Sequence, residues 1–321
     1  MIASLVLLQA ALSIAVAGPA TSPEFLPLHV AAAEGYFAEE NVAVSLETKR
    51  SDSLASQALG RGQVDLAATS LDAALLVGQT GGAPPRVVFG LTGLPPVVLV
   101  VTASEKDRIR SPADLRGSLI GIASPGTPGE LVLFTLLARA GVGVHQVTIQ
   151  SFGDRPLVGA VESGRVAAAM LDDPWASRLI AEGKAVALAD LRERGEAARW
   201  LGEPTVHAAI FARADSKLGA AELTPFCRAL LRALARIREA GADQLAAKLP
   251  PAVVGPPDEF AARLAGARNS FLPDGRVTAD MLAAGIAQIR LRTVLPDKLK
   301  IPRNLDKLLL SEPLDQALRR R

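Results

Sequence analysis

The sequence predicts an α/β protein built as two lobes joined by two crossover strands. Short apolar, β-branched runs alternate with helical patterns along most of the chain, which is typical of parallel sheets covered by helices. Residues 62–70 and 164–173 repeat one pattern of glycine, buried strand and polar loop, which indicates two related halves. Two further apolar runs, at 97–102 and 207–212, lie where the chain would cross between the halves.

Size and composition agree with this architecture and exclude several functions. A chain of 321 residues is long enough for about two domains. Lys and Arg total 35 against 33 Asp and Glu, and no basic stripe with interleaved aromatics is visible, which argues against nucleic-acid binding. The only cysteine, Cys227, excludes an intramolecular disulfide and a Cys-based zinc site.

The first 17 residues have two interpretations. Residues 2–17 are almost wholly apolar and could be a signal-peptide core with a cleavage site at 15–17, but the first cationic residue of the chain is Lys49. Alternatively, residues 12–17 form the first strand, and residues 1–11 are the remnant of a signal that starts upstream. We favour the second interpretation because the predicted fold needs a first strand.

Local signals mark several later elements. A helix is expected near residues 27–34, followed by Gly35 and Asn41, which tolerate left-handed backbone before the next strand. Capping patterns with a proline at the first helical position predict helices that begin after Ser111, Thr127 and Thr224. The last of these is a long helix with one apolar stripe.

The crossover runs define the predicted domains. If both runs cross between the halves, lobe 1 consists of residues 12–96 and 207–321, and lobe 2 of residues 97–206. The mostly helical C-terminal part would then pack back on lobe 1.

A family resemblance rests on four segments in order: residues 26–42, 62–68, 114–127 and 162–174. They resemble the periplasmic binding proteins for nitrate, sulfonates, taurine and thiamine precursors, the NMT1/THI5-like or sulfonate-binding-like family. Asn41 replaces a glycine that is usual there, and Ala167 replaces an aspartate. The match covers most of residues 12–215.

This resemblance implies a type II periplasmic-binding-protein fold and a role in an ABC transporter. The protein would capture a small polar or anionic organic ligand in the periplasm and deliver it to a permease and its ATPase. We expect a monomer that meets the membrane only through the permease, with no cofactor and no metal.

The predicted ligand site lies at the carboxyl ends of the strands, where helix N-termini offer backbone N–H groups. Hydroxyl side chains are frequent in these loops and suit an oxyanion or a neutral polar ligand. The candidate ligand-binding residues are Thr21, Ser22, Phe25, Thr69, Ser70, Thr92, Gly93, Ser124, Gly126, Thr127, Arg155, Asp173 and Trp175.

Several of these residues have a second interpretation. Ser70 and Thr127 can be helix caps alone. Arg155 can clamp a carboxylate or sulfonate or be a solvated surface residue. Asp173 would suit a cationic ligand, which opposes the anion hypothesis, or cap the following helix. Trp175 is a candidate pocket wall because it follows two acids.

The sequence offers little for catalysis. The three histidines are scattered without metal-ligand spacing, and neither a nucleophile elbow nor a P-loop lysine is present. Two alternatives stay open: a small-molecule enzyme on the same fold, with pyrimidine-precursor or chorismate-type chemistry, and a sensory binding module.

Overall fold

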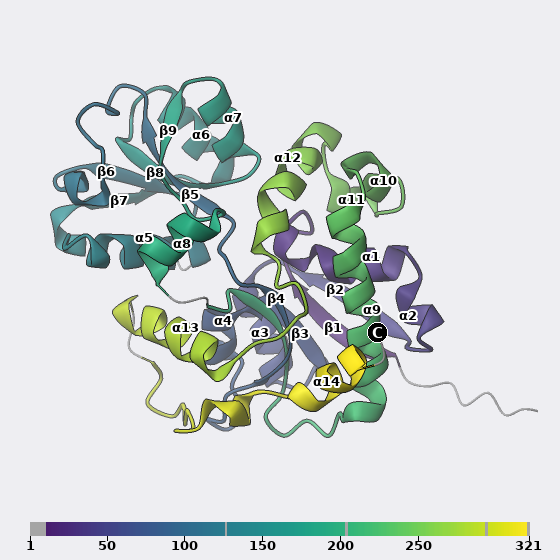
Figure 1. Cartoon of the computed structure of the whole chain (residues 1–321). Helices are drawn as coiled ribbons and strands as arrows, with labels where there is room; N and C mark the ends of the chain where they lie inside the picture. Colours follow the sequence, from purple (N-terminus) through teal and green to yellow (C-terminus); the bar gives the residue numbers. More distant parts are fainter. Residues whose placement is uncertain (1–10, 126, 203–204, 293–294, 320–321) are drawn as a thin grey trace, which may run out of the picture.

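The computed structural model describes residues 11–125, 127–202, 205–292 and 295–319. The chain forms two α/β lobes, each built on a five-stranded sheet (Figure 1). This confirms the predicted fold class. The signal remnant predicted for residues 1–11 lies outside the described residues, except for Ala11.

Lobe 1 contains the sheet with strand order β2-β1-β3-β10-β4. Its strands are β1 (Leu12–Ala17), β2 (Val44–Lys49), β3 (Leu66–Ser70), β4 (Arg86–Thr92) and β10 (Ala208–Ala212). β1 pairs in parallel with β2 and β3, and β10 runs antiparallel to β3 and β4. The run at 12–17 is therefore the first strand, as predicted, and it lies inside the sheet.

Lobe 2 repeats this arrangement in the order β7-β6-β8-β5-β9. Its strands are β5 (Val97–Thr102), β6 (Leu119–Ile122), β7 (Thr148–Ser151), β8 (Ala168–Asp172) and β9 (Ala185–Asp190). β5 is antiparallel to β8 and β9. The sequence repeat falls on β3 and β8, which occupy the same position in the two sheets.

The two crossover runs are the strands β5 and β10, by which the chain enters lobe 2 and returns to lobe 1. Each is the antiparallel strand of its sheet, fourth in the strand order. The connections at 93–96 and 205–207 precede them. The domain boundaries at 96 and 207 stay a prediction.

Helices cover both faces of the lobe 1 sheet. β2 and β3 lie on opposite sides of β1, so right-handed crossovers put α1 and α3 on opposite faces of the sheet. α9 packs against α1, α2 and α14. The helices of the first segment are α1 (Leu26–Ala33), α2 (Tyr36–Glu39), α3 (Asp52–Gly60) and α4 (Leu71–Val77).

The C-terminal helices mostly return to lobe 1 (Figure 1). They are α9 (Ala220–Glu239), α10 (Ala242–Ala246), α11 (Pro251–Val254), α12 (Pro257–Ala267), α13 (Ala279–Arg292) and α14 (Ser311–Arg319). α13 also packs against α5 of lobe 2. Short 3-10 turns occupy Pro23–Phe25, Pro112–Leu115, Val144–Gln146, Arg268–Ser270 and Leu305–Leu308.

One predicted helix start is wrong. α9 begins at Ala220, with the N–H of Gly219 donating to Glu222 at 3.0 Å, and Pro225 lies inside the helix. The helix tolerates the missing N–H of this proline because its apolar stripe is fully buried, including Phe226 and Leu230. Burial of the stripe outweighs the local cost of the proline.

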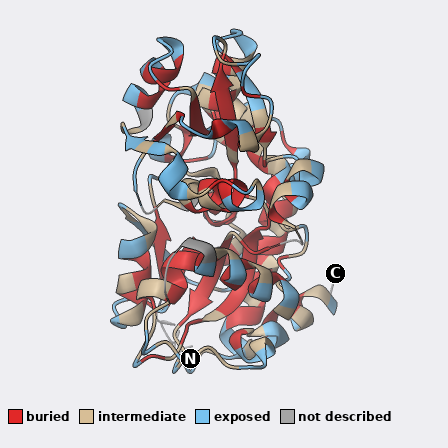
Figure 2. Ribbon diagram, turned by 90° about the vertical axis from the view of Figure 1, so that its left-hand side faces the viewer, coloured by how far each residue is buried: buried red, intermediate tan, exposed pale blue. Residues whose placement is uncertain are grey.

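Lobe 2 carries α5 (Pro128–Arg139), α6 (Asp154–Glu162), α7 (Trp175–Ala181) and α8 (Arg194–Leu201). The predicted start after Thr127 is confirmed, because Thr127 caps α5. Ser111 forms the predicted cap with Asp114, but the element that follows is a four-residue 3-10 turn and not an α-helix. Separate apolar clusters cover the two faces of the lobe 2 sheet, so each lobe has its own core (Figure 2).

Candidate functional site

A cleft between the lobes is the candidate site, because the carboxyl ends of the parallel strands in both sheets face it. Several contacts join the lobes there. α13 packs on α5, and Leu131 of α5 joins the apolar core of lobe 1. Gly266 of α12 lies against Asp173 of lobe 2, where an added Cβ atom would overlap the Asp173 carboxylate and lie 3.4 Å from Arg192 Cδ.

The connection from β1 to α1 forms part of the lobe 1 side of the candidate site. It carries the predicted residues Thr21 and Ser22, which are partly buried, and Phe25, which is buried. The 3-10 turn that follows Ser22 packs against α12. The turn also presents Glu24, which the sequence analysis did not single out.

Next to this connection, Asp52 at the start of α3 organises the end of β3. Its Oδ1 accepts the hydroxyl of Thr69 at 3.0 Å and the backbone N–H of Ser70 at 2.7 Å. Thr69 also lies 3.2 Å from the Ser56 hydroxyl. The Ser70 hydroxyl is buried and has no hydrogen-bond partner within the described part of the chain.

Thr92 and Gly93 lie at the first crossover. Thr92 is fully buried and accepts the N–H of Ala208 at 3.2 Å. A Cβ atom at Gly93 would come 2.8 Å from Leu272 Cδ2 and 3.3 Å from the Thr205 carbonyl oxygen. These two predicted residues hold the hinge connections together in this structure.

In lobe 2, the loop before α5 carries Ser124 and Thr127. The Thr127 hydroxyl donates to the Ser124 carbonyl at 2.9 Å and accepts the Glu130 N–H at 3.4 Å. Gly126 lies outside the described residues. Arg155, at the start of α6, is exposed.

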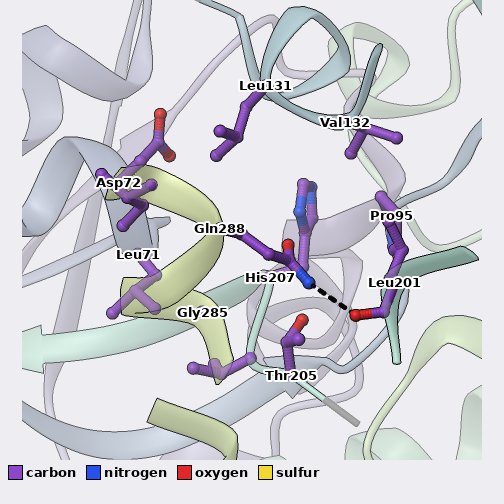
Figure 3. Close-up of a pocket in the computed structure, with 12 residues that line it drawn as sticks. Leu71, Asp72, Pro95, Leu131, Val132, Leu201, Thr205, His207, Gly285 and Gln288 are labelled. Atoms are coloured by element: carbon purple, nitrogen blue, oxygen red, sulfur yellow. Dashed lines mark hydrogen bonds between the residues drawn. The ribbon is translucent and has the colours of Figure 1, made fainter. Parts of the chain in front are cut away.

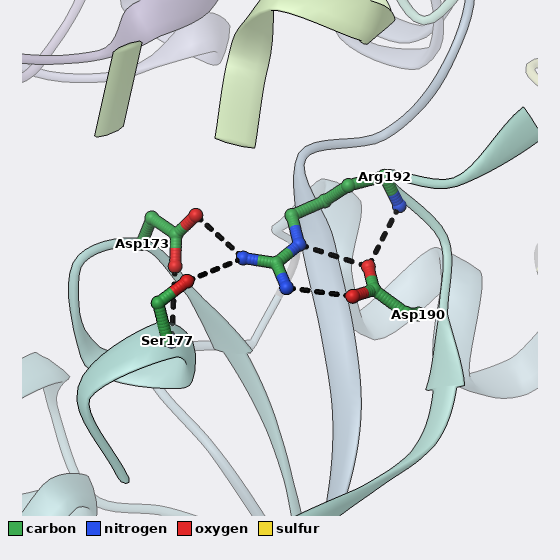
Figure 4. Close-up of polar contacts among 4 residues, drawn as sticks. All are labelled: Asp173, Ser177, Asp190 and Arg192. Carbon is green, nitrogen blue, oxygen red and sulfur yellow. Dashed lines mark hydrogen bonds and ion pairs between the residues drawn. The ribbon is translucent and has the colours of Figure 1, made fainter. Parts of the chain in front are cut away.

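An ion-pair network joins the loop after β8 to the end of β9 (Figure 4). Arg192 donates to Asp173 at 2.5 Å, to the Ser177 hydroxyl at 2.9 Å and to both oxygens of Asp190 at 2.8 and 2.6 Å. The carboxylate of Asp173 therefore has an internal counter-charge. Trp175 is partly buried, with the Arg178 guanidinium 4.8 Å from its ring centroid.

A small cavity of about 30 Å³ lies beside the crossover connections (Figure 3). Its polar groups are Asp72, Thr205, His207 and Gln288, and Gln288 donates to the Leu201 carbonyl at 3.4 Å. Its other lining residues are Leu71, Pro95, Leu131, Val132, Leu201, Val206, Gly285 and Ile289. The lining comes from both lobes and contains no Lys or Arg.

The charges around the cleft are mainly negative. Removal from water raises the pKa of Glu24 to about 7. A hydrogen bond from the backbone N–H of Glu24 lowers this pKa, and the charges of Asp52 and Asp172 raise it further. Burial lowers the pKa of His207, and the charges of Asp72 and Asp52 oppose that shift in part. The imidazole is therefore neutral at pH 7, with one donor and one acceptor nitrogen.

Besides Arg192, the cation Arg263 stands near these acids. Arg263 of α12 is buried and close enough to feel the charge of Asp172. Its guanidinium donates to the Val254 carbonyl at 2.6 Å and pairs with Glu259 at 3.4 Å. Burial lowers the pKa of Arg263.

Comparison with known proteins identifies the family. A family model described as NMT1/THI5 like matches residues 22–240, which include every strand named above except β1. The chain belongs to the NMT1/THI5-like family.

Solved structures share the fold of this NMT1/THI5-like protein over nearly its whole length. A Bordetella bronchiseptica RB50 protein is 25% identical with a TM-score of 0.76, covering 97% of this chain and 98% of that one. The periplasmic aliphatic sulphonate binding protein SsuA from Escherichia coli is 18% identical with a TM-score of 0.73, covering 95% and 99%. At that identity, the likeness to SsuA concerns the fold alone.

A curated relative covers less of the chain. The riboflavin-binding protein RibY of Chloroflexus aurantiacus is 31% identical over 133 residues, which are 40% of this chain and 37% of that protein. The chain therefore matches only about a third of the length of RibY.

Sequence reasoning missed most of the charged groups of the cleft. Arg192 follows β9 directly, so the rule that found the other strand-end loops could also have found it. Glu24 and Asp52 were given no role, although Glu24 lies between the candidates Ser22 and Phe25, and His207 was noted only as one of three histidines without metal-ligand spacing. Within the described residues, no group of three or more His, Cys, Asp or Glu side chains could hold a metal ion.

Proposed function

We propose that this protein is the solute-binding component of an ABC importer and acts outside the cytoplasmic membrane. It captures a small organic ligand in the cleft and delivers it to a permease and its ATPase. None of the described helices is long and apolar enough to cross a bilayer, and on this proposal the permease supplies the contact with the membrane.

The observation that carries the proposal is the pair of matching sheets whose strand ends meet at one cleft. In open α/β sheets, ligands bind beyond the carboxyl ends of the strands. Here two such ends face each other, and the cavity between them is lined from both lobes. Family membership and the names of SsuA and RibY as binding proteins support the same function.

The proposed mechanism is closure of the two lobes. The connections at 93–96 and 205–207 act as the hinge, and a ligand that touches both lobes favours the closed form. The ligand leaves chemically unchanged. The single thiol, Cys227, is buried in α9, where burial raises its pKa to about 12, so it is a core residue in this mechanism.

A ligand screen with two readouts tests this function. Thermal unfolding is measured with sulfonates, carboxylates, pyrimidines and riboflavin, and each stabilising compound is then examined by small-angle scattering. We expect a cognate ligand to raise the unfolding midpoint and to decrease the radius of gyration. Tight binding without compaction contradicts lobe closure, and conversion of the bound compound to a product contradicts transport.

A further inference from the structure

A second cavity lies between the lobes beside the hinge connections. Its volume is about 90 Å³, against about 30 Å³ for the cavity of Figure 3, and the two cavities share Leu201 and Thr205 in their walls. Of the residues predicted to bind the ligand, only Gly93 lines it. This second cavity is therefore distinct from the candidate site in the cleft.

One wall of the second cavity is a single side of α8 in lobe 2. Arg194, Ala197, Ala198 and Leu201 line the cavity, and their i, i+3, i+4 and i+7 spacing puts them on one side of the helix. Ala197 and Leu201 are buried, whereas Arg194 and Ala198 are exposed. The small side chains of the two alanines leave the space open, and the Arg194 end of this wall reaches solvent.

The opposite wall is the segment that follows α12 in lobe 1. It contributes Phe271, which is buried, and Leu272, which is partly buried. This segment is fixed to the end of β4, because the Leu272 N–H donates to the Leu91 carbonyl at 2.9 Å and the Gly93 N–H donates to the Ser270 carbonyl at 2.8 Å. The cavity therefore has one apolar wall that belongs to lobe 1 and one that belongs to lobe 2.

The charge and the size of the cavity indicate the class of molecule that it suits. Among the described lining residues, Arg194 is the only charged one. Glu196 lies on the other side of α8, where it accepts the Trp200 Nε1–H at 3.0 Å and pairs with Arg199 at 3.4 Å. A guanidinium at the rim of an apolar space suits a carboxylate. An apolar cavity of about 150 Å³ holds benzene, so the smaller space here suits a short alkyl chain.

We propose that this cavity is a second binding site, for a short-chain carboxylate. Its alkyl chain lies between α8 and Phe271, and its carboxylate meets Arg194. Burial of the chain supplies most of the affinity, and the guanidinium selects the head group. Because each lobe supplies one wall, an occupant that touches both walls favours the lobe spacing of this structure. The site does not depend on which ligand the cleft binds.

Three probes with the same alkyl chain test the ligand class: pentanoate, pentan-1-ol and pentylammonium. Each is titrated into the methyl-labelled full chain, and the methyl signals of Ala198 and Leu272 are followed by NMR. We expect saturable shifts, with pentanoate binding about threefold more tightly than pentan-1-ol, as an exposed ion pair allows, and pentylammonium binding most weakly.

Two outcomes overturn this inference. One is the absence of a saturable shift of these methyl signals with pentanoate. The other is pentylammonium binding as tightly as pentanoate or more tightly. The transport function is judged separately by the ligand screen on the cleft, so it stands in either case.

Two variants assign the binding to this cavity. Ala198→Leu fills the cavity from its exposed side and should abolish the pentanoate-induced shift at Leu272 without lowering the unfolding midpoint. Arg194→Gln should reduce the affinity for pentanoate to that for pentan-1-ol and leave pentan-1-ol binding unchanged, whereas a merely structural role would weaken both alike. Arg199→Gln, on the other side of α8, is the charge-matched control. Unchanged pentanoate binding in Ala198→Leu, or equal losses in Arg194→Gln and Arg199→Gln, overturns the proposed site.

Small-angle scattering tests the link to lobe spacing. Saturating pentanoate should decrease the radius of gyration of the wild type and leave that of Ala198→Leu unchanged. An unchanged radius in the wild type, or an equal decrease in both proteins, overturns the link between this site and the position of the lobes.

Discussion

Polar side chains at the strand ends of this protein fall into two groups. Thr69, Thr127 and Asp173 are held by hydrogen bonds to their own lobe, and they shape the loops on which the cleft is built. Ser70 instead has a buried hydroxyl without a hydrogen-bond partner among the described residues. Unsatisfied polar groups are costly to a fold and therefore point to ligand contact.

The raised pKa of Glu24 makes a prediction about stability. The folded state binds a proton between the ordinary pKa of 4.5 and about 7, so the free energy of unfolding falls as the pH rises through this window. Glu24→Gln removes the effect. The variant should unfold a few degrees above the wild type at pH 8 and at nearly the same temperature near pH 4.5, as measured by calorimetry. An equal gain at both pH values would show that the carboxyl does not titrate in this window.

Single elements follow local sequence signals where backbone geometry decides the outcome. Gly35 and Asn41 have φ values of 78° and 57°, so both positions predicted to be left-handed are so. The caps at Ser111 and Thr127 were likewise read correctly. The start of α9 was not, because burial of its apolar stripe against α1 and the sheet extends the helix past Pro225.

Substitutions at Asn41 test whether the left-handed backbone geometry decides which residues this turn accepts. Its left-handed backbone costs about 1–2 kcal/mol for a residue with a branched Cβ and little for Asn or Gly. Asn41→Gly should leave the free energy of unfolding within about 0.5 kcal/mol of the wild type, and Asn41→Val should lower it by about 1–2 kcal/mol. Denaturant unfolding of the two variants measures this. Equal stabilities would show that the turn relaxes to another conformation.

At the scale of the whole molecule, the lobes meet closely on both sides of the hinge. α13 packs on α5, and Gly266 of α12 touches the Asp173–Arg192 pair. A larger side chain at residue 266 has no room while the lobes are this close. In the proposed closure, a side chain at residue 266 would therefore have to displace the Asp173 carboxylate.

Gly266→Leu should therefore hold the lobes apart. We expect it to weaken by at least tenfold any ligand that compacts the wild type, and to abolish the compaction seen by scattering. Gly159→Ala is the control, because a Cβ atom on that helical glycine meets nothing within 4 Å. Normal compaction in Gly266→Leu would show that the closed form does not need this contact.

The sequence by itself determined the α/β class, the first strand at 12–17, the two crossover strands and the order of the strand-end loops. These features are set by apolar periodicity, by turn residues and by capping, all of which act over a few residues. Only the tertiary structure decided that Asp173 pairs with Arg192 and that the charges of Asp52 and Asp172 act on the Glu24 carboxyl. Those groups lie far apart along the chain, and their charges and burial arise only when two separate lobes come together.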